Sequence, residues 1–146
     1  MRCEKTIFLL KPGRALKSHH AICEEIKNLG LRITESYMVL LTENHLIAMY
    51  GYLPDTLYDA TFKHLLGKRK RCPVFLLEGN DAIRRLASYA GCHVDPNQCE
   101  EETIRFRYSD PPQDLGNGLI YYPNGIHCPK NPKEAQRDIN LFFRNA

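Results

Sequence analysis

The sequence predicts a single α+β domain of ferredoxin-like βαββαβ order, with helices packed on one face of a four-stranded antiparallel sheet. Short apolar runs of strand length alternate with stretches of helical spacing, and this alternation gives the element order. The 146 residues, of which 43% are hydrophobic and 25% charged, fit one globular domain of roughly 100–200 residues. Because no repeat or low-complexity block marks a linker, residues 1–146 are expected to form one domain.

The first part of the chain supplies two strands and one helix. Residues 5–11 (KTIFLLK) are apolar and end at a Pro-Gly pair, which is typical of a buried strand that enters a turn. Residues 20–29 place apolar side chains at helical spacing ahead of a glycine, which predicts a helix. Residues 31–41 alternate between apolar and polar types, which predicts the second strand.

Helices and a central strand follow. Thr42 is a candidate N-cap for a helix that runs to Tyr50, because threonine side chains accept hydrogen bonds from the first helical turn. Pro54 is suited to begin another helix. Residues 73–77 (PVFLL) are wholly apolar, which predicts a central strand.

The last part of the chain is less regular. Residues 81–90 precede a glycine and read as a helix. Residues 92–122 are rich in proline and glycine, which predicts a long loop, and loops of this length are usually functional. A short helix is expected at 132–137, and residues 138–143 (DINLFF) are expected to close the sheet as its fourth strand.

The composition narrows the class of protein. The net charge of +3 is mild and suits a small anionic ligand as well as nucleic acid. No apolar run approaches the ~18 residues of a membrane span, and the N-terminal apolar stretch is too short for a signal peptide. These patterns predict a cytoplasmic protein that does not enter a membrane.

The six cysteines are scattered without a CxxC pair, so free thiols are expected. Cys92, His93 and Cys99 lie close together in sequence, and a zinc site there is conceivable. Structural zinc usually shows two close ligand pairs, and the second pair is missing. No metal held by protein ligands alone is therefore expected.

A basic turn, GKRKR, occupies residues 67–71. We favour a solvated loop over nucleic-acid binding, because neither interleaved aromatic side chains nor a known nucleic-acid motif accompanies it. A single-stranded nucleic-acid binder stays open as a weaker alternative, and steep salt dependence of binding is its mark.

No phosphate-binding loop, dinucleotide fingerprint, metalloprotease motif or nucleophile elbow occurs. Three polar features remain. Lys11 is either a solvent-facing strand end or a cation aimed at phosphate. Arg105 is either a surface arginine or a bidentate phosphate clamp. His127, taken alone, reads as a surface loop histidine.

Together, these pieces resemble the nucleoside diphosphate kinase family in their order and spacing. The resemblance covers nearly the whole chain, from Glu4 to Phe143. It is carried by EKTIFLLKP at 4–12, His45-Leu46 with Tyr50, Leu77-Glu78-Gly79, Asp95-Pro96, Thr103-Ile104-Arg105, Asn124-Gly125-Ile126-His127 and the closing residues 135–143. Each fragment is short, but the ordered set is specific.

The resemblance implies a ping-pong transfer of the γ-phosphate from a nucleoside triphosphate to a nucleoside diphosphate through a phosphohistidine. His127 is the implied nucleophile. Lys11 and Tyr50 are implied contacts of the travelling phosphoryl group, and Arg105 of the remaining phosphates. Mg²⁺ is implied as an ion that arrives with the nucleotide.

The remaining roles follow from the same resemblance. Asn124, with Lys11, is implied to reach the sugar hydroxyls. Tyr58 stands where the family places a phenylalanine that stacks on the base, and Asp138 stands in for a glutamate that orients the histidine. The family forms hexamers or tetramers built from dimers, so a homo-oligomer is expected.

The chain also departs from the family. Ala87 occupies the position of a second phosphate-binding arginine, and Arg84, one helical turn earlier, is the candidate substitute. The family's phosphate-contacting threonine after Gly91 is displaced, and His93 or Val94 stands there. Cys128-Pro129 follows the histidine in place of Gly-Ser, which removes a hydroxyl and a backbone N–H.

Two functions from different classes stay open. One is a divergent but working kinase, and the other is a degenerate member that binds nucleotide or a protein partner with weak turnover or none. We favour the kinase, because a module that only binds has little reason to keep His127, Lys11 and Asn124 together.

The segment between Arg105 and Asn124 is longer than in the family by roughly nine residues. Its apolar and aromatic end, Leu119 to Tyr122, is expected to pack against a neighbouring subunit or the base pocket, because exposed patches of this kind usually mark contacts. Burial within its own subunit is the alternative.

Overall fold

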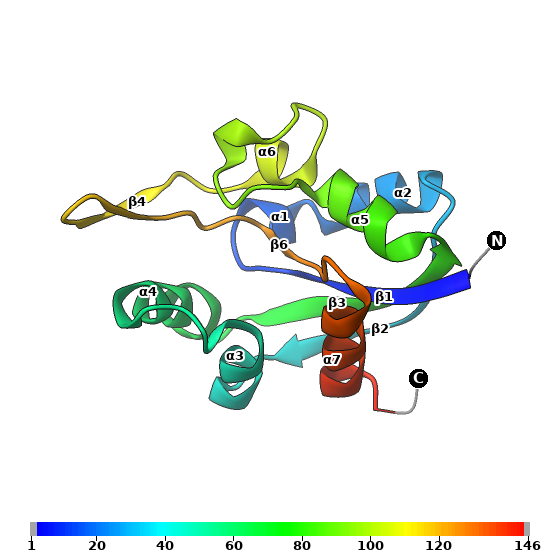
Figure 1. The fold of residues 1–146 in the computed structure, drawn as a ribbon, viewed down its shortest axis with the longest axis horizontal. Helices are drawn as coiled ribbons and strands as arrows, with labels where there is room; N and C mark the ends of the chain where they lie inside the picture. The colour runs from blue at the N-terminus through cyan, green and yellow to red at the C-terminus, as the bar shows by residue number, and fades with distance from the viewer. Residues whose placement is uncertain (1–2, 145–146) are drawn as a thin grey trace.

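A computed structural model describes residues 3–144 (Figure 1). In chain order the elements are β1 (Cys3–Leu10), α1 (Arg14–Lys17), α2 (His19–Asn28), β2 (Arg32–Leu40), α3 (Glu43–Tyr50), α4 (Asp55–Leu66), β3 (Arg71–Asn80), α5 (Ala82–Ala90), the 3₁₀ turn η1 (Pro96–Gln98), α6 (Ile104–Tyr108), β4 (Gln113–Gly116), β5 (Leu119–Tyr121), β6 (Ile126–His127) and α7 (Pro132–Phe142).

The main sheet has four antiparallel strands in the order β2-β3-β1-β6. The two central strands are the most apolar, and their register places Phe8 opposite Phe75 with stacked rings 4.3 Å apart. The predicted ferredoxin-like α+β fold is confirmed. The three predicted strands within 5–11, 31–41 and 73–77 are present.

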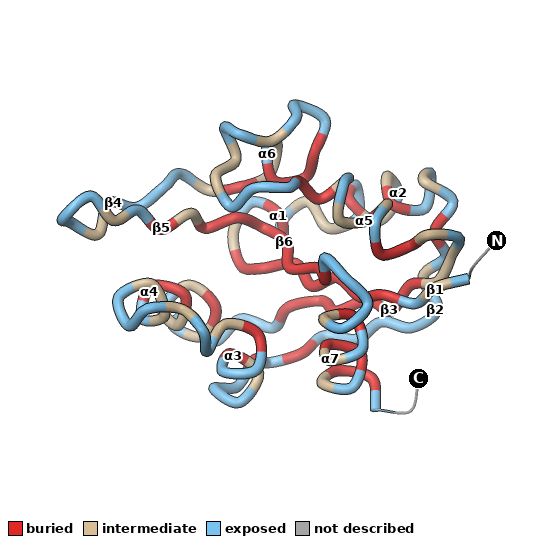
Figure 2. The backbone as a smooth tube through the Cα atoms, viewed as in Figure 1, coloured by how far each residue is buried: buried red, intermediate tan, exposed pale blue. Residues whose placement is uncertain are grey.

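Helices cover both faces of this sheet, so the expectation that they pack on one face is wrong. Alternate residues of β1 point to opposite sides: Phe8 and Leu10 join the core under α2 and α5, whereas Ile7 and Leu9 join the core over α3 and α7. Figure 1 shows α1, α2, α5 and α6 on one side and α3, α4 and α7 on the other. A strand that is apolar at every position needs cover on both faces, and Figure 2 shows the central strands buried.

The expected fourth strand at 138–143 is also wrong, because residues 138–142 form the second half of α7 and Phe143 is its C-cap. Ala135, Ile139 and Phe142 recur at helical spacing and face the core. The helix has a full N-terminal signal, since the Asn131 side chain accepts from the Glu134 N–H and proline follows the cap. The fourth strand is instead the two-residue β6.

The segment 92–122 is more regular than expected. It contains η1, α6 and a two-stranded hairpin, β4–β5, here called the arm, which projects from the body of the molecule (Figure 1). The glycines of this segment predicted irregular structure. Gly118 instead forms the tip of the hairpin with Asn117, and their φ values are 76° and 54°.

Several local signals are confirmed. The Thr42 side chain accepts a hydrogen bond from the His45 N–H and caps α3. The basic residues 68–70 are exposed in the turn after α4. Within residues 3–144, no helix is both long and apolar enough to cross a membrane.

Candidate active site

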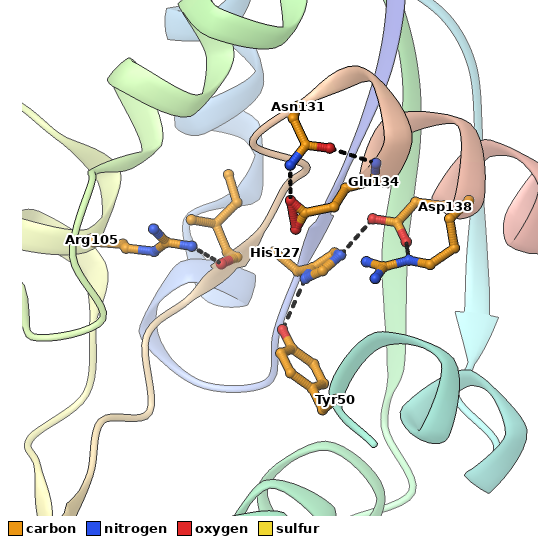
Figure 3. Close-up of polar contacts among 8 residues, drawn as sticks. Tyr50, Arg105, His127, Asn131, Glu134 and Asp138 are labelled. Atoms are coloured by element: carbon orange, nitrogen blue, oxygen red, sulfur yellow. Dashed lines mark hydrogen bonds and ion pairs between the residues drawn. The ribbon is translucent and has the colours of Figure 1, made fainter. Parts of the chain in front are cut away.

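His127 lies at the end of β6, opposite Leu9 of β1, and only 8% of its surface is exposed. Both of its ring nitrogens have partners (Figure 3). Nε2 lies 2.8 Å from a carboxylate oxygen of Asp138, and Nδ1 lies 2.9 Å from the hydroxyl oxygen of Tyr50. The ring is therefore held between α7 and α3.

The partners of His127 define its protonation. An ionised carboxylate only accepts hydrogen bonds, so Nε2 carries the proton and Nδ1 keeps a lone pair. Burial lowers the pKa of His127, and this effect exceeds the opposing pull of Asp138, so the ring is neutral near pH 7. A neutral imidazole with its lone pair on Nδ1 is a competent nucleophile.

Asp138 is fully buried in α7 and has two donors. Burial raises the pKa of this carboxyl, but the hydrogen bonds from His127 and Arg137 outweigh it and hold the pKa below its usual value. The Arg137 Nε donates to the second carboxylate oxygen at 2.8 Å. Sequence reasoning missed Arg137, although its place beside Asp138 was a usable signal.

Lys11 ends β1 with a buried amine. Its Nζ donates to the Asn124 side-chain oxygen at 3.1 Å and lies 5.1 Å from the centre of the Tyr50 ring. Burial first, and then the nearby Arg105 guanidinium, lowers the pKa of Lys11 to about 7. Lys11, Tyr50 and Asn124 are thus brought together beside His127, as the family resemblance implies.

These three residues open onto one cavity of about 200 Å³. Its walls come from the α3–α4 region, the turn after α5 and the base of the arm, and its lining contains no carboxylate. The other residues that line it are Tyr52, Leu53, Leu57, Thr61, Val94, Ile120, Tyr121 and Tyr122. Of the Leu119–Tyr122 run, Ile120, Tyr121 and Tyr122 line this cavity within their own subunit, and contact with a base or a neighbouring subunit stays a prediction. The other lining residues were missed.

Tyr58 is not brought to this cavity. Leu57 and Thr61 share the helix face that lines it, since they are four residues apart, whereas Tyr58 packs against the core beneath α3 and α4. Its hydroxyl is buried with no hydrogen-bond partner among the described residues. Of these two neighbouring residues, Leu57 is the one that borders the cavity.

The two arginines expected to bind phosphates lie on a neighbouring groove with Ser88 and Lys130. Arg84 is exposed and pairs with Asp81 on its own helix. Arg105 is buried, and its Nη atoms donate to the carbonyl oxygens of Gly91 and Ile126, while its Nε has no partner among the described residues. Arg84 is therefore not brought to Lys11 and Tyr50.

The conceivable zinc ligands are not arranged as a site. The Cys99 thiol lies 3.3 Å from the main-chain oxygen of His93. Among residues 3–144, no group of three or more His, Cys, Asp or Glu side chains is placed to hold a metal ion.

Comparison with known proteins agrees with this arrangement. A family model described as nucleoside diphosphate kinase matches residues 4–146. The nucleoside diphosphate kinase of Polynucleobacter necessarius subsp. necessarius is 27% identical over 98% of this chain and 94% of its own length. That of Thermococcus kodakarensis is 28% identical over 97% of this chain and 77% of its own length.

A solved structure shares the fold over almost the whole chain. The nucleoside-diphosphate kinase of Borrelia burgdorferi, a transition-state mimic with bound vanadate and ADP, matches with a TM-score of 0.82 at 20% identity and covers 98% of this chain and 88% of its own. Because the family model spans residues 4–146, nearly the whole chain, the chain belongs to the nucleoside diphosphate kinase family.

Proposed function

We propose that the chain transfers the γ-phosphate of a nucleoside triphosphate to a nucleoside diphosphate through a phosphohistidine at His127. One observation carries the proposal: Asp138 holds Nε2, while Nδ1 faces the hydroxyl of Tyr50 beside the buried amine of Lys11. Family membership supports the class of reaction, a phosphotransfer between nucleotides. The ADP bound to the Borrelia relative supports nucleotides as ligands of the cavity.

In the first half-reaction the Nδ1 lone pair of His127 attacks the γ-phosphorus. The N–P bond forms as the bond from phosphorus to the β–γ bridging oxygen breaks, and the electron pair leaves with the nucleoside diphosphate. Positive charge that develops on the ring is stabilised through Nε2–H by Asp138. The Tyr50 hydroxyl, which occupies Nδ1 before the reaction, turns to a phosphate oxygen when the phosphoryl group arrives.

Lys11 supplies the compensating charge. A lysine with a pKa near 7 is only partly protonated in the free protein, but a phosphate beside it favours the ammonium form. Because only 5% of its surface is exposed, water screens this charge weakly. Lys11 therefore stabilises the phosphoryl oxygens as the P–O bond breaks.

The second half-reaction reverses these events with a different nucleotide. A β-phosphate oxygen of the incoming diphosphate attacks phosphorus, the N–P bond breaks and its electron pair returns to Nδ1. Mg²⁺ enters as part of the nucleotide substrate, which agrees with a cavity lining without a carboxylate. We assign the sugar contacts to Asn124 and Lys11, which both line the cavity, and the base to its apolar walls.

The test is direct. The protein is incubated with γ-labelled ATP, and the retained label is exposed to acid and to base. We expect label that acid releases and base preserves, as phosphohistidine requires, and transfer of that label to added diphosphate. His127→Ala should retain nucleotide binding and lose label, whereas His20→Ala, at an exposed position of α2, should behave as the wild type. Near-normal turnover by His127→Ala would contradict the assignment.

A second function, nucleotide binding with weak turnover, is favoured by one observation. Arg105 is committed to two backbone carbonyls and Arg84 to Asp81, so neither guanidinium is free for a phosphate in this structure. Tight ADP binding combined with a trace of phosphoenzyme would support this alternative.

A homo-oligomer, as a hexamer or a tetramer of dimers, and a cytoplasmic location complete the proposal. The apolar side chains of Tyr37, Met38 and Leu40 on β2 are each between 42% and 50% exposed, which supports self-association. Sedimentation of the wild type against Met38→Glu tests it, and a monomer in both cases would contradict it.

A further inference from the structure

We propose that His64 is a positioning residue of the nucleotide cavity, which fixes the base of the arm against the turn that follows Lys11. The proposal rests on the proposed function, since it concerns a wall of the same cavity. His64 lies in the last turn of α4 and is not one of the residues that line the cavity. It therefore acts through its neighbours.

The ring of His64 joins two segments that are far apart in sequence. Its Nε2 lies 2.8 Å from the carbonyl oxygen of Pro12, and its Nδ1 lies 2.7 Å from the hydroxyl oxygen of Tyr121. The His64 and Tyr121 rings meet edge to face, with centroids 5.8 Å apart and planes at 76°. One side chain thus connects α4, the end of β1 and the arm.

The chemistry of the partners decides which atoms donate. A carbonyl oxygen only accepts, so Nε2 carries the proton and donates to Pro12. Nδ1 then offers a lone pair, and the Tyr121 hydroxyl donates to it. Burial lowers the pKa of His64 to about 4 and raises the pKa of Tyr121 to about 12, so both keep these roles at neutral pH.

Both joined segments belong to the cavity wall. Tyr121 lines the cavity with its neighbours in the arm, and Pro12 directly follows Lys11, whose amine contacts Asn124. The arm is a two-stranded ribbon, and an isolated ribbon of this kind is marginally stable in water. The position of the arm over the cavity therefore depends on contacts where the arm joins the body of the molecule. The hydrogen bond from Tyr121 to His64 fixes the orientation of the arm at that point.

The first experiment removes one oxygen. Tyr121→Phe keeps the ring and loses the hydrogen bond, and we expect the Kd for ADP by calorimetry to rise about 3- to 10-fold, the scale of one hydrogen bond. The KM for the triphosphate should rise by the same factor, with kcat changed by less than about twofold. Tyr89→Phe is the matched control, because it loses a hydroxyl that donates to Glu25 between α5 and α2, and it should leave the Kd unchanged.

The second experiment places the effect on His64. His64→Leu removes both hydrogen bonds, and in that background Tyr121→Phe should cost no further ADP affinity because its partner is already gone. His64→Gln, which keeps an amide donor for Pro12, should recover part of the affinity. Equal effects of Tyr121→Phe with and without His64, or a lower melting temperature with an unchanged Kd, would overturn the proposal.

The two proposals fail separately. The Kd for ADP needs no turnover, so a wild type that binds ADP without forming a phosphoenzyme would overturn the proposed function and leave the role of His64 supported by its own variants. A wild type that transfers phosphate while the His64 and Tyr121 variants bind normally would overturn only the role of His64. A wild type that binds no ADP would overturn both.

Discussion

The reacting end and the nucleotide end of the site are built differently. At the reacting end, His127, Asp138 and Lys11 lie on β6, α7 and the end of β1, and each is buried with a hydrogen-bonded side-chain partner. At the nucleotide end, the walls come from the α3–α4 region, which includes the α4 face of Leu57 and Thr61, from the turn after α5 and from the arm. The sheet and α7 hold the proposed reacting groups, whereas α4, connecting segments and the arm form most of the cavity wall.

This difference explains which family features survive at about 27% identity. The proposed nucleophile His127 and its carboxylate partner Asp138 are positioned by the packing of β1, β6 and α7, so a change there disturbs the core as well. Connecting segments tolerate insertion and substitution. The arm, which the resemblance marks as longer than the corresponding family segment, lies at that end, whereas Ala87 lies on α5 beside the neighbouring groove.

The largest loss of activity is expected from a substitution of Lys11, at the reacting end of the site. Lys11→Met keeps a long apolar stem and removes the cation, so kcat should fall about 10²- to 10³-fold, the scale of one transition-state donor. Lys5→Met, at an exposed position of the same strand, is the control and should keep the wild-type rate. A fall confined to KM would place Lys11 at the nucleotide end instead.

Asp138 should come next. Asp138→Asn leaves an amide whose NH₂ group competes for Nε2 and favours the wrong ring tautomer, so kcat should fall about 10- to 100-fold while the Kd for ADP stays the same. Burst measurements of the phosphoenzyme check it. A matched loss at Asn140→Ala, on an exposed part of α7, would show that the helix rather than the carboxylate is responsible.

The pH dependence tests the same end. Burial lowers the pKa of Lys11 to about 7, so its charged, phosphate-binding form is lost from the free protein as pH rises through 7. The kcat/KM should therefore fall about tenfold between pH 6 and pH 8. Lys11→Arg keeps its charge and should flatten this limb. Because burial lowers the pKa of His127, its ring becomes protonated and loses the free lone pair only at a pH below the usual histidine pKa.

The smallest effect is expected at Tyr58. Tyr58→Phe removes a buried hydroxyl that has no partner among the described residues, so the melting temperature should rise slightly while the KM for every nucleotide stays unchanged. Leu57→Ala, which enlarges the cavity wall, is the comparison and should raise KM. A raised KM in the Tyr58→Phe variant would show that Tyr58 contributes to nucleotide binding.

The elements that carry the reacting end could be predicted from the sequence better than the segments that line the cavity. Strands that are apolar throughout and the capped helix after Thr42 carry local signals, so these elements were predicted correctly. The run DINLFF is too short for its periodicity to distinguish a helix from a strand. The signal for a helix is the N-cap at Asn131, eight residues before Ile139. The family resemblance predicted that His127, Lys11, Tyr50 and Asn124 act in one site, although they lie far apart in the sequence.

Other contacts left no local signal. The hydrogen bonds of His64 to Pro12 and Tyr121 span 52 and 57 residues, so spacing along the chain contains nothing that predicts them. Arg105 was expected to face phosphate, but the carbonyls that it meets belong to a turn and a strand whose approach only the fold decides. Long-range polar contacts of this kind are fixed by topology rather than by sequence pattern.

The two edges of the sheet are unequal. β6 contributes only two residues to its edge of the sheet, and the chain turns into a Pro-containing segment directly after His127. β2 presents nine residues at the opposite edge. The longer edge strand, β2, therefore offers the longer template for a further strand, and it lies at the opposite edge of the sheet from His127.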